Sequence, residues 1–444
     1  MTAIPPFPQG PFVTHAVCRI CGETVAPRDM GYVCPDHAGE LENEGILDLR
    51  YDYQAARSAF TPEALARGPQ TLWRYRSLLP LPLDAETPPL VTGWTPLYES
   101  PRLARLLGVA RVLIKDETRQ PTASLKDRAS ALAVAQAKSM GLTTVACAST
   151  GNAAAALAGM AASMNLNCVI FVPASAPQAK VAQLLAFGAR VFTVQGSYDD
   201  AFDLCMAACQ VRPWYNRNTA YNPFMTEGKK TAAFEIAEQS GWEVPDRVFV
   251  GVGDGCIIGG LHKGFADLQA LGLTTRLPRL MGVQAAGSDY LHQAWHNNEA
   301  PLTKPAIPAR TVADSISAGL PRDRLKALAA VRETHGAFIK VDDPTILHAI
   351  PTLARNTGVF AEPAGAAALA GALATAQTSD LSPTETICLL ITGSGLKDVT
   401  SAIKACSDQN LAPTPVPIGR RGLDQVLEGL HAKSSLYPGL PSSR

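Results

Sequence analysis

The chain has 444 residues, a length that favours two or three domains over one. Apolar residues make up 47% of it and charged residues 18%, which is typical of a packed globular enzyme and excludes a disordered chain. The 39 basic residues balance 39 acidic ones, so the net charge indicates no nucleic-acid partner.

The sequence also indicates in which cellular compartment the protein resides. No apolar run reaches the length of a membrane span, and the N-terminus lacks a signal-peptide pattern. Several of the ten cysteines lie inside apolar segments, which favours a reducing environment. We therefore predict a soluble cytoplasmic protein without a membrane or nucleic-acid partner.

The first distinct motif is a pair of short knuckles, Cys18-x-x-Cys21-Gly and Cys34-x-x-His37. Thiolates and an imidazole at this spacing can close a tetrahedral zinc site. The alternative is four unrelated residues. We predict a zinc-ribbon-like segment over residues 1–48 that holds a structural zinc ion.

A strand-to-helix unit follows an irregular packing arm over Asp48–Pro89. The apolar run Val112–Ile114 predicts a strand, and Ser124–Arg128 opens an alanine-rich helix. Lys126 therefore lies near a helix N-terminus, where the helix dipole disfavours an ammonium group and favours loss of its proton, as imine formation requires. The alternative is a solvated lysine in the first turn.

From about Ala129 to Leu271 strand-like and helical patterns alternate, which predicts parallel α/β architecture. We expect two open sheet domains: a large one from residues 49–135 and 236–407, interrupted by a small mobile one over 136–235, with a loosely docked tail over 408–444. The clearest strands are predicted at Thr144–Ala148, Asn167–Pro173, Arg190–Val194 and Ile387–Thr392.

Three loops follow predicted strands and can bind a ligand. Ala148–Asn152 opens a helix, so its N–H groups can bind a carboxylate. Val250–Gly260 can wrap a phosphate, but it has Cys256 where a dinucleotide fingerprint needs glycine, and it lacks the Gly-Lys-Ser/Thr of a Walker loop. Thr392 lies at a strand end, where a hydroxyl could bond a ring nitrogen. Each loop could also be a plain turn or helix cap.

These features suit one cofactor when they are taken together. Pyridoxal phosphate has an aldehyde, a phosphate and a ring nitrogen, and it needs a lysine, a phosphate-binding loop and a polar partner for the ring. No convincing Ser/His/Asp triad or catalytic metal cluster competes with this interpretation.

The ordered motifs resemble the threonine synthase-like group of pyridoxal-phosphate enzymes, which have the tryptophan synthase β-like fold. The resemblance runs from about Cys18 to Cys406, and the zinc-ribbon-like start also looks like that of some members. It implies an amino-acid substrate and a homodimer. It rests on GWTPL, PTASLKDR, ASTGN, NPFMTEGKKTAAFEI, VGDG, ADSISAGLPRDR, EPAGAAALAG and TGSGLKD.

The resemblance also implies roles for individual residues. Lys126 would form the Schiff base with the cofactor and then act as general base at Cα. Asn152 would bind the pyridoxal 3-hydroxyl, and Thr392 would face the pyridine nitrogen. Two loops complete the implied site: the substrate carboxylate would be bound by Ser149, Thr150 and Gly151, and the cofactor phosphate by the backbone amides of Gly253, Asp254, Gly255, Cys256 and Ile257.

The substrate site departs from the family pattern. Threonine synthases bind the phosphate of phosphohomoserine with hydroxyls after the Gly-Asn pair and with an arginine, but here these positions are Ala153 and Met225, and Ala220 replaces a serine. Each lost charge-assisted bond removes roughly 1.5–3 kcal/mol, which predicts a leaving group other than phosphate. Lys229, where glutamine is usual, or Arg217 could compensate.

We therefore predict an enzyme that deprotonates Cα of an α-amino acid and then catalyses β- or γ-elimination or replacement. Three alternatives stay open. They are an authentic threonine synthase with a rearranged phosphate site, a serine/threonine-type dehydratase, and a catalytically silent binding module that uses zinc.

Overall fold

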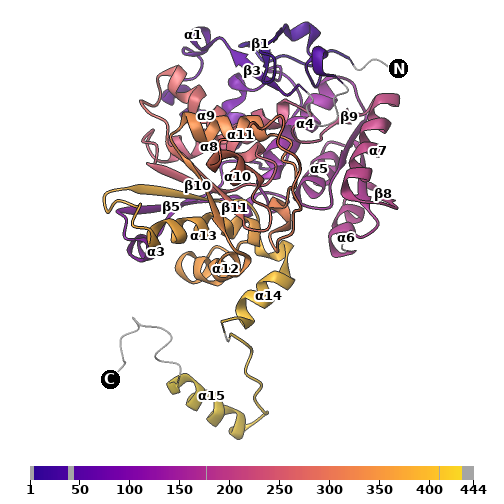
Figure 1. The fold of residues 1–444 in the computed structure, drawn as a ribbon. Coiled ribbons are helices and arrows are strands. Elements are labelled where there is room, and N and C mark those ends of the chain that lie inside the picture. The colour runs from indigo at the N-terminus through magenta and orange to yellow at the C-terminus, as the bar shows by residue number, and fades with distance from the viewer. Residues whose placement is uncertain (1–4, 39–44, 177, 410, 433–444) are drawn as a thin grey trace.

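The computed structural model describes residues 5–38, 45–176, 178–409 and 411–432 (Figure 1). Within these residues the strands form three sheets. The N-terminal sheet is antiparallel and has the order β2-β1-β3, with β1 at Val13–Cys18, β2 at Thr24–Val25 and β3 at Leu47–Tyr51.

The large sheet has six strands in the order β12-β11-β10-β13-β5-β4. All neighbours are parallel except β4 and β5, so the carboxyl ends of five strands meet at one edge. The bounds are β4 Leu97–Glu99, β5 Arg111–Asp116, β10 Arg247–Gly251, β11 Arg279–Ala285, β12 Ala337–Val341 and β13 Thr386–Ile391.

The small sheet is parallel and has the order β8-β7-β6-β9. Its strands are β6 Thr144–Ala148, β7 Asn167–Pro173, β8 Arg190–Val194 and β9 Tyr215–Asn216. All of them lie inside the predicted small domain of residues 136–235, and the three strands with predicted bounds have those bounds. The domain boundaries themselves stay a prediction.

Helices cover both larger sheets, and the long helix α8 packs against both α4 and α9. The small sheet packs against α5, α6 and α7, which lie together with β8 on the right of Figure 1. The large sheet packs against α3, α10, α11 and α13, with α12 on α13 and α14 on α12. The first eight helices are α1 Tyr53–Ala56, α2 Pro62–Ala66, α3 Pro101–Leu107, α4 Lys126–Ser139, α5 Asn152–Ser163, α6 Gln178–Ala186, α7 Tyr198–Val211 and α8 Phe224–Gln239.

The remaining helices complete the large-sheet layer and the C-terminal part. They are α9 Cys256–Leu271, α10 Tyr290–His296, α11 Arg324–Glu333, α12 Asp343–Thr357, α13 Pro363–Gln377, α14 Val399–Ser407 and α15 Arg420–Ala432. Figure 1 shows α15 below the body of the molecule, within the predicted tail, whose residues 433–444 lie outside the described chain. None of the described helices is long and apolar enough to cross a membrane.

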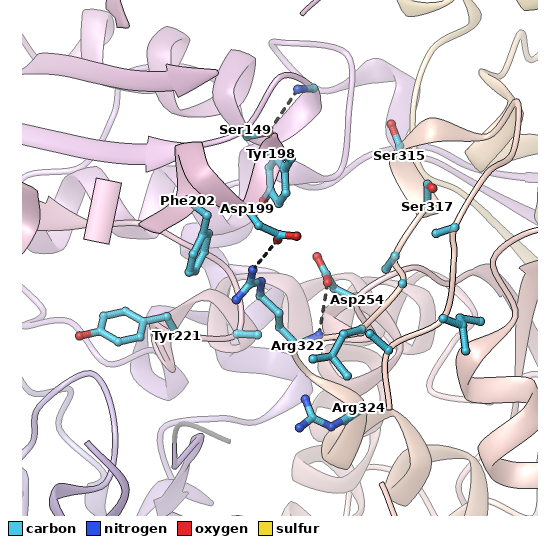
Figure 2. Close-up of a pocket in the computed structure, with 18 of the residues that line it drawn as sticks. Ser149, Tyr198, Asp199, Phe202, Tyr221, Asp254, Ser315, Ser317, Arg322 and Arg324 are labelled. Atoms are coloured by element: carbon cyan, nitrogen blue, oxygen red, sulfur yellow. Dashed lines mark hydrogen bonds and ion pairs between the residues drawn. The ribbon is translucent and has the colours of Figure 1, made fainter. Parts of the chain in front are cut away.

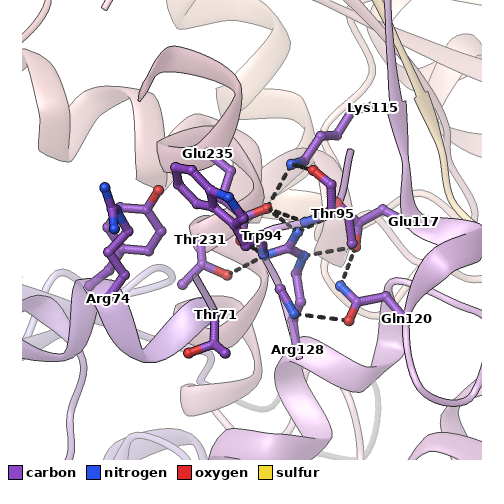
Figure 3. Close-up of polar contacts among 12 residues, drawn as sticks. Thr71, Arg74, Trp94, Thr95, Lys115, Glu117, Gln120, Arg128, Thr231 and Glu235 are labelled. Atoms are coloured by element: carbon purple, nitrogen blue, oxygen red, sulfur yellow. Dashed lines mark hydrogen bonds and ion pairs between the residues drawn. The ribbon is translucent and has the colours of Figure 1, made fainter. Parts of the chain in front are cut away.

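A buried ionic network joins the start of α4 to α8 and β5 (Figure 3). Arg128 Nη2 lies 2.6 Å from Glu117 Oε1, and Arg128 Nη1 lies 2.5 Å from Glu235 Oε1. Lys115 Nζ contacts Glu235 Oε2 at 2.6 Å, and all four side chains are fully buried. Two cations therefore balance two carboxylates, as a buried ionic cluster requires.

The network predicts a large loss of stability when one charge is removed. Burial alone would raise the pKa of Glu235, but Arg128 and Lys115 outweigh it and lower the pKa to about 2. We expect Glu235→Gln to reduce the free energy of unfolding by about 3–5 kcal/mol, because a buried positive charge is left unbalanced. Urea denaturation measures this difference.

The matched control is Glu99→Gln, which removes a carboxylate from the half-exposed pair with Arg111. A surface pair contributes at most about 1 kcal/mol, so the control should change the unfolding midpoint little. Equal losses in the two variants would contradict a special role for the buried network.

Candidate active site

Two adjoining cavities lie where strands of the two larger sheets end. The inner cavity has a volume of about 110 Å³ and is lined by Lys126, Arg217 and the loop Gly251–Ile258, among others. The outer cavity has a volume of about 810 Å³. Both are lined by Ser149, Tyr198, Phe202, Asp254, Ser315 and Arg322, so they form one continuous site at the edge where parallel sheets bind ligands.

Lys126 begins α4 and faces the inner cavity. The preceding residue anchors it, because the Leu125 N–H donates to the Thr392 carbonyl oxygen at 2.9 Å. Among the described residues, Lys126 Nζ has no hydrogen-bond partner. Burial lowers the pKa of Lys126, and Arg217 lowers it further, so the amine is more readily neutral than an ordinary lysine.

The glycine loop after β10 presents its backbone to the inner cavity. No hydrogen bond within the described chain uses the N–H groups of Gly253 or Gly255. Gly255 has φ +94°, and a Cβ there would lie 2.7 Å from Ala327 Cβ; a Cβ on Gly253 would lie 2.8 Å from Ile316 Cα. Both positions therefore need glycine, and the free N–H groups next to the N-terminus of α9 can bind an anion.

The remaining members of the predicted phosphate loop also line this cavity. The side chain of Asp254 points to the segment that precedes α11, because the Arg322 N–H donates to Asp254 Oδ1 at 3.3 Å. Cys256 and Ile257 begin α9. The structure thus brings the whole predicted loop and Lys126 to one cavity.

Asn152 lies against Glu362, a residue to which the sequence assigned no role. Asn152 Nδ2 donates to Glu362 Oε1 at 2.7 Å. The loop after β13 passes beside the pair, because a Cβ on Gly393 would lie 2.4 Å from Glu362 Oε1. Thr392 precedes this glycine and is buried. The sequence motif Glu362-Pro-Ala-Gly could have indicated that Glu362 belongs to the site.

A third, side cavity of about 300 Å³ adjoins this pair and is lined by Thr150, Gly151, Asn152, Glu362 and Lys397, among others. Burial and, after it, the charge of Asp314 raise the pKa of Glu362 to about 7, although Lys397 and the hydrogen bond from Asn152 oppose this shift. Glu362 is therefore partly protonated near neutral pH.

The carboxylate-binding turn opens on the outer cavity, which Ser149, Thr150 and Gly151 line. The Gly151 N–H donates to Ser149 Oγ at 3.2 Å, so the turn is closed by its own side chain. Tyr198, on α7, donates its hydroxyl hydrogen to the Ala148 carbonyl oxygen at 3.4 Å and covers this turn.

The positions that depart from the family pattern are divided between the cavity walls and the core. Ala153 lines the inner cavity, and Ala220 lines the outer one. Met225 is 1% exposed, packs in the hydrophobic core, and lines none of these three cavities. Its side chain therefore lies apart from the surface that a substrate could reach.

Two ion pairs join the layers on either side of the outer cavity. Arg322 Nη2 contacts Asp199 Oδ1 at 3.1 Å, and its guanidinium lies 3.8 Å from the ring centre of Phe202 (Figure 2). Lys180, on α6, pairs with Asp314. Sequence patterns did not identify these residues, because their partners are more than a hundred positions away.

The four residues of the two knuckles also come together. Ligand atoms of Cys18, Cys21 and His37 lie within 4.8 Å of one another, and the sulfurs of Cys21 and Cys34 are 3.9 Å apart. The Ile20 N–H points at Cys18 Sγ at 3.4 Å. A Cβ on Gly45 would lie 2.5 Å from Cys34 Cβ, so the segment closes tightly over the cluster.

The residues around the inner cavity fit pyridoxal phosphate. Lys126 offers an amine without a partner among the described residues, and the glycine loop offers free N–H groups. These are the partners that an aldehyde and a phosphate require. Thr392, the predicted partner of the ring nitrogen, is buried and lines none of the three cavities.

Comparison with known proteins agrees with this site. Residues 89–393 match the family model described as "Pyridoxal-phosphate dependent enzyme". Threonine synthase from Methanosarcina acetivorans is 36% identical over 95% of this chain and 99% of its own length. Threonine synthase from Methanocaldococcus jannaschii is 35% identical over 93% of this chain and 99% of its own length.

Solved structures show the same fold. Threonine deaminase isoform 2 from Solanum lycopersicum has a TM-score of 0.60 at 23% identity, over 72% of this chain and 88% of its own. Diaminopropionate ammonia lyase from Escherichia coli has a TM-score of 0.60 at 21% identity, with the same coverage.

The chain belongs to the pyridoxal-phosphate dependent enzyme family and has the tryptophan synthase β-like fold. It is a pyridoxal-phosphate-dependent lyase or synthase, which confirms the predicted fold class, the enzyme class and pyridoxal phosphate as a cofactor.

The raised pKa of Glu362 predicts a pH-dependent stability. A carboxyl whose pKa rises from 4.5 to about 7 on folding stabilises the fold fully below about pH 4.5, and this contribution is lost as the pH rises through 7. Glu362→Gln keeps a neutral partner for Asn152, so we expect the difference in free energy of unfolding between variant and wild type to grow with pH by up to about 1.4 kcal/mol per unit. Urea denaturation at pH 4.5 to 7.5 measures it; a constant difference would contradict the raised pKa.

Proposed function

We propose that the protein binds an α-amino acid, removes its Cα proton, and then catalyses β- or γ-elimination or replacement of a group other than phosphate. The observation that carries the proposal is Lys126, whose amine has no hydrogen-bond partner among the described residues and faces the same small cavity as the free N–H groups of the glycine loop. Both lie beside a larger cavity with room for an amino acid.

Separate groups of residues would bind the cofactor and the substrate. Gly253, Asp254, Gly255, Cys256 and Ile257 would hold the cofactor phosphate, Asn152 its 3-hydroxyl and Thr392 its ring nitrogen. Pyridoxal phosphate supplies an electron sink that weakens the Cα–H bond of an attached amino acid. Ser149, Thr150 and Gly151 would orient the substrate carboxylate with N–H groups at the start of α5.

Lys126 would move the proton. Its lowered pKa leaves a larger neutral fraction near pH 7, and a neutral amine is required to accept the proton from Cα. The surrounding burial limits access of water to the amine during this transfer. The same ammonium group could then return its proton to a leaving group or to a neighbouring carbon.

The leaving group is inferred from Ala153 and Ala220, which line the cavities without offering a hydrogen-bond donor side chain. An authentic threonine synthase is the second candidate, and the two archaeal threonine synthases favour it because they match nearly their whole lengths. A serine/threonine-type dehydratase would use the same lysine and loops and would release a ketoacid.

We expect Lys126→Ala to lose the visible absorbance of the lysine-bound cofactor and at least about 10²-fold in activity, because a positioned base contributes that much. The assay presents phosphohomoserine and a panel of β- and γ-substituted amino acids, with product analysis for threonine and ketoacids. Lys138→Ala, at the far end of the same helix, is the control and should keep both properties. A colourless wild type would favour the binding-module alternative.

The product pattern separates the enzymatic candidates. Turnover of another substituted amino acid, with little threonine from phosphohomoserine, supports a changed leaving group. Efficient threonine formation from phosphohomoserine would overturn it and identify the second candidate. Ketoacid release from serine or threonine would identify a dehydratase.

We also propose a structural zinc ion held by Cys18, Cys21, Cys34 and His37, supported by the closeness of their ligand atoms. Elemental analysis should find one zinc per chain in the wild type, and a Cys18→Ser/Cys21→Ser variant should lose it with a lower melting temperature. Cys406→Ser, a free cysteine on α14, is the control. A stable wild type that neither contains nor takes up zinc would contradict the site.

The ten cysteines are free thiols, which supports the proposal of a reducing, cytoplasmic setting. The homodimer stays a prediction.

A further inference from the structure

Arg217, on the wall of the inner cavity, and Lys229, on α8, each have a buried nitrogen without a hydrogen-bond partner among the described residues. These atoms are Arg217 Nη2 and Lys229 Nζ. Both residues are 1% exposed. A buried charge without a partner is strongly unfavourable, so a bound anion would stabilise both cations.

The rest of the Arg217 guanidinium is held in place. Nε donates to Ser130 Oγ at 3.2 Å, and Nη1 donates to Thr219 Oγ1 at 2.8 Å. Ser130 lies one turn after Lys126 on α4. Arg217 therefore lines the inner cavity beside Lys126 with one nitrogen left to bind a further group.

Lys229 approaches α9 from α8 and is not among the residues that line the inner cavity. A Cβ on Gly260 would lie 2.9 Å from Lys229 Cβ, so the stem of the lysine runs against the first turns of α9. The charges of Arg217 and Lys126 both act on Lys229, so its ammonium group lies within electrostatic reach of the two cations that line the cavity.

The acidic residues nearby oppose this charge only over a distance. Asp323 acts on Lys229 but forms no ion pair with it in the described chain, and Asp254 accepts hydrogen bonds from the backbone of Arg322 and Asp323. Burial lowers the pKa of Lys229 to about 7; Arg217 and Lys126 contribute to this shift, while Cys256 and Asp323 oppose it. A dianion beside Lys229 would favour its charged form.

We propose that Arg217 and Lys229 form a cationic floor that binds a phosphate-type dianion at the N-terminus of α9. The dianion is either the cofactor phosphate, which the glycine loop would share, or the phosphate of a substrate, which would favour the authentic threonine synthase over a changed leaving group. The inference rests on the proposed function for the choice of ligands, and binding measurements test it independently of turnover.

The test uses Lys229→Gln and Arg217→Met in the full chain, with Arg217→Lys as the charge-conserving variant and Lys138→Gln as a control far along α4. Equilibrium dialysis compares pyridoxal phosphate with pyridoxal, which lacks the phosphate. If the floor holds the cofactor, each neutral variant binds pyridoxal phosphate about 10- to 100-fold more weakly, as expected for a lost charge-assisted bond, while pyridoxal binding is unchanged. Arg217→Lys recovers part of the affinity.

A second arm keeps the cofactor saturating and adds inorganic phosphate. If the floor serves the substrate, the cofactor affinity of the variants is unchanged, but phosphate raises the melting temperature of the wild-type holoenzyme and not of the variants. Either arm supports the floor and identifies its ligand. Unchanged responses in both arms, or equal losses for pyridoxal and pyridoxal phosphate, would overturn it.

The cofactor-free chain provides a readout that a merely structural role would not give. Removing an unpaired buried charge should stabilise this form, so Lys229→Gln should melt at a higher temperature than the wild type without cofactor and phosphate, yet bind the dianion more weakly. A lower melting temperature of Lys229→Gln in the cofactor-free state would contradict a charge that lacks a partner. If every amino acid fails as a substrate, the proposed reaction fails while these binding results still stand.

Discussion

The buried network around Arg128 is the interaction on which the site depends. Arg128 lies two residues after Lys126, on the first turn of α4, and it is clamped between Glu117 and Glu235. Because Glu235 belongs to α8 and Glu117 follows β5, these charges fix the start of α4 against both the large sheet and a neighbouring helix. Lys126 is therefore positioned by a rigid, charge-balanced cluster (Figure 3).

The same helix contacts carry the chemistry of the inner cavity. α4 brings Lys126, α8 brings Lys229 and α9 follows the free N–H groups of the glycine loop, and α8 packs against both α4 and α9. Arg128 on α4 and Lys230 on α8 are paired with buried carboxylates, whereas Lys229 Nζ and Arg217 Nη2 have no hydrogen-bond partner among the described residues. These two unsatisfied nitrogens are the candidates for binding an anion.

The outer cavity lies between two layers of the fold. Its walls come from the large-sheet layer, with Asp254 and Arg322, and from the small-sheet layer, with Ser149 and Tyr198. The contacts that cross it are an ion pair between Arg322 and Asp199 and another between Lys180 and Asp314, both partly exposed. Pairs of this kind contribute little free energy, so they can open at small cost when a substrate enters.

The sequence by itself determined the local elements and the kind of chemistry. Apolar runs and small-residue helices are encoded by neighbouring residues, so β6, β7 and β8 have their predicted bounds, and Lys126 begins the predicted helix. The order of the glycine-containing motifs was enough to indicate the cofactor. Only the tertiary structure decided which side chains share a cavity. It paired Asn152 with Glu362, buried Met225 in the core, and left Arg217 Nη2 and Lys229 Nζ without a hydrogen-bond partner among the described residues. These outcomes involve residues distant in the chain and depend on how α8 packs against α4 and α9.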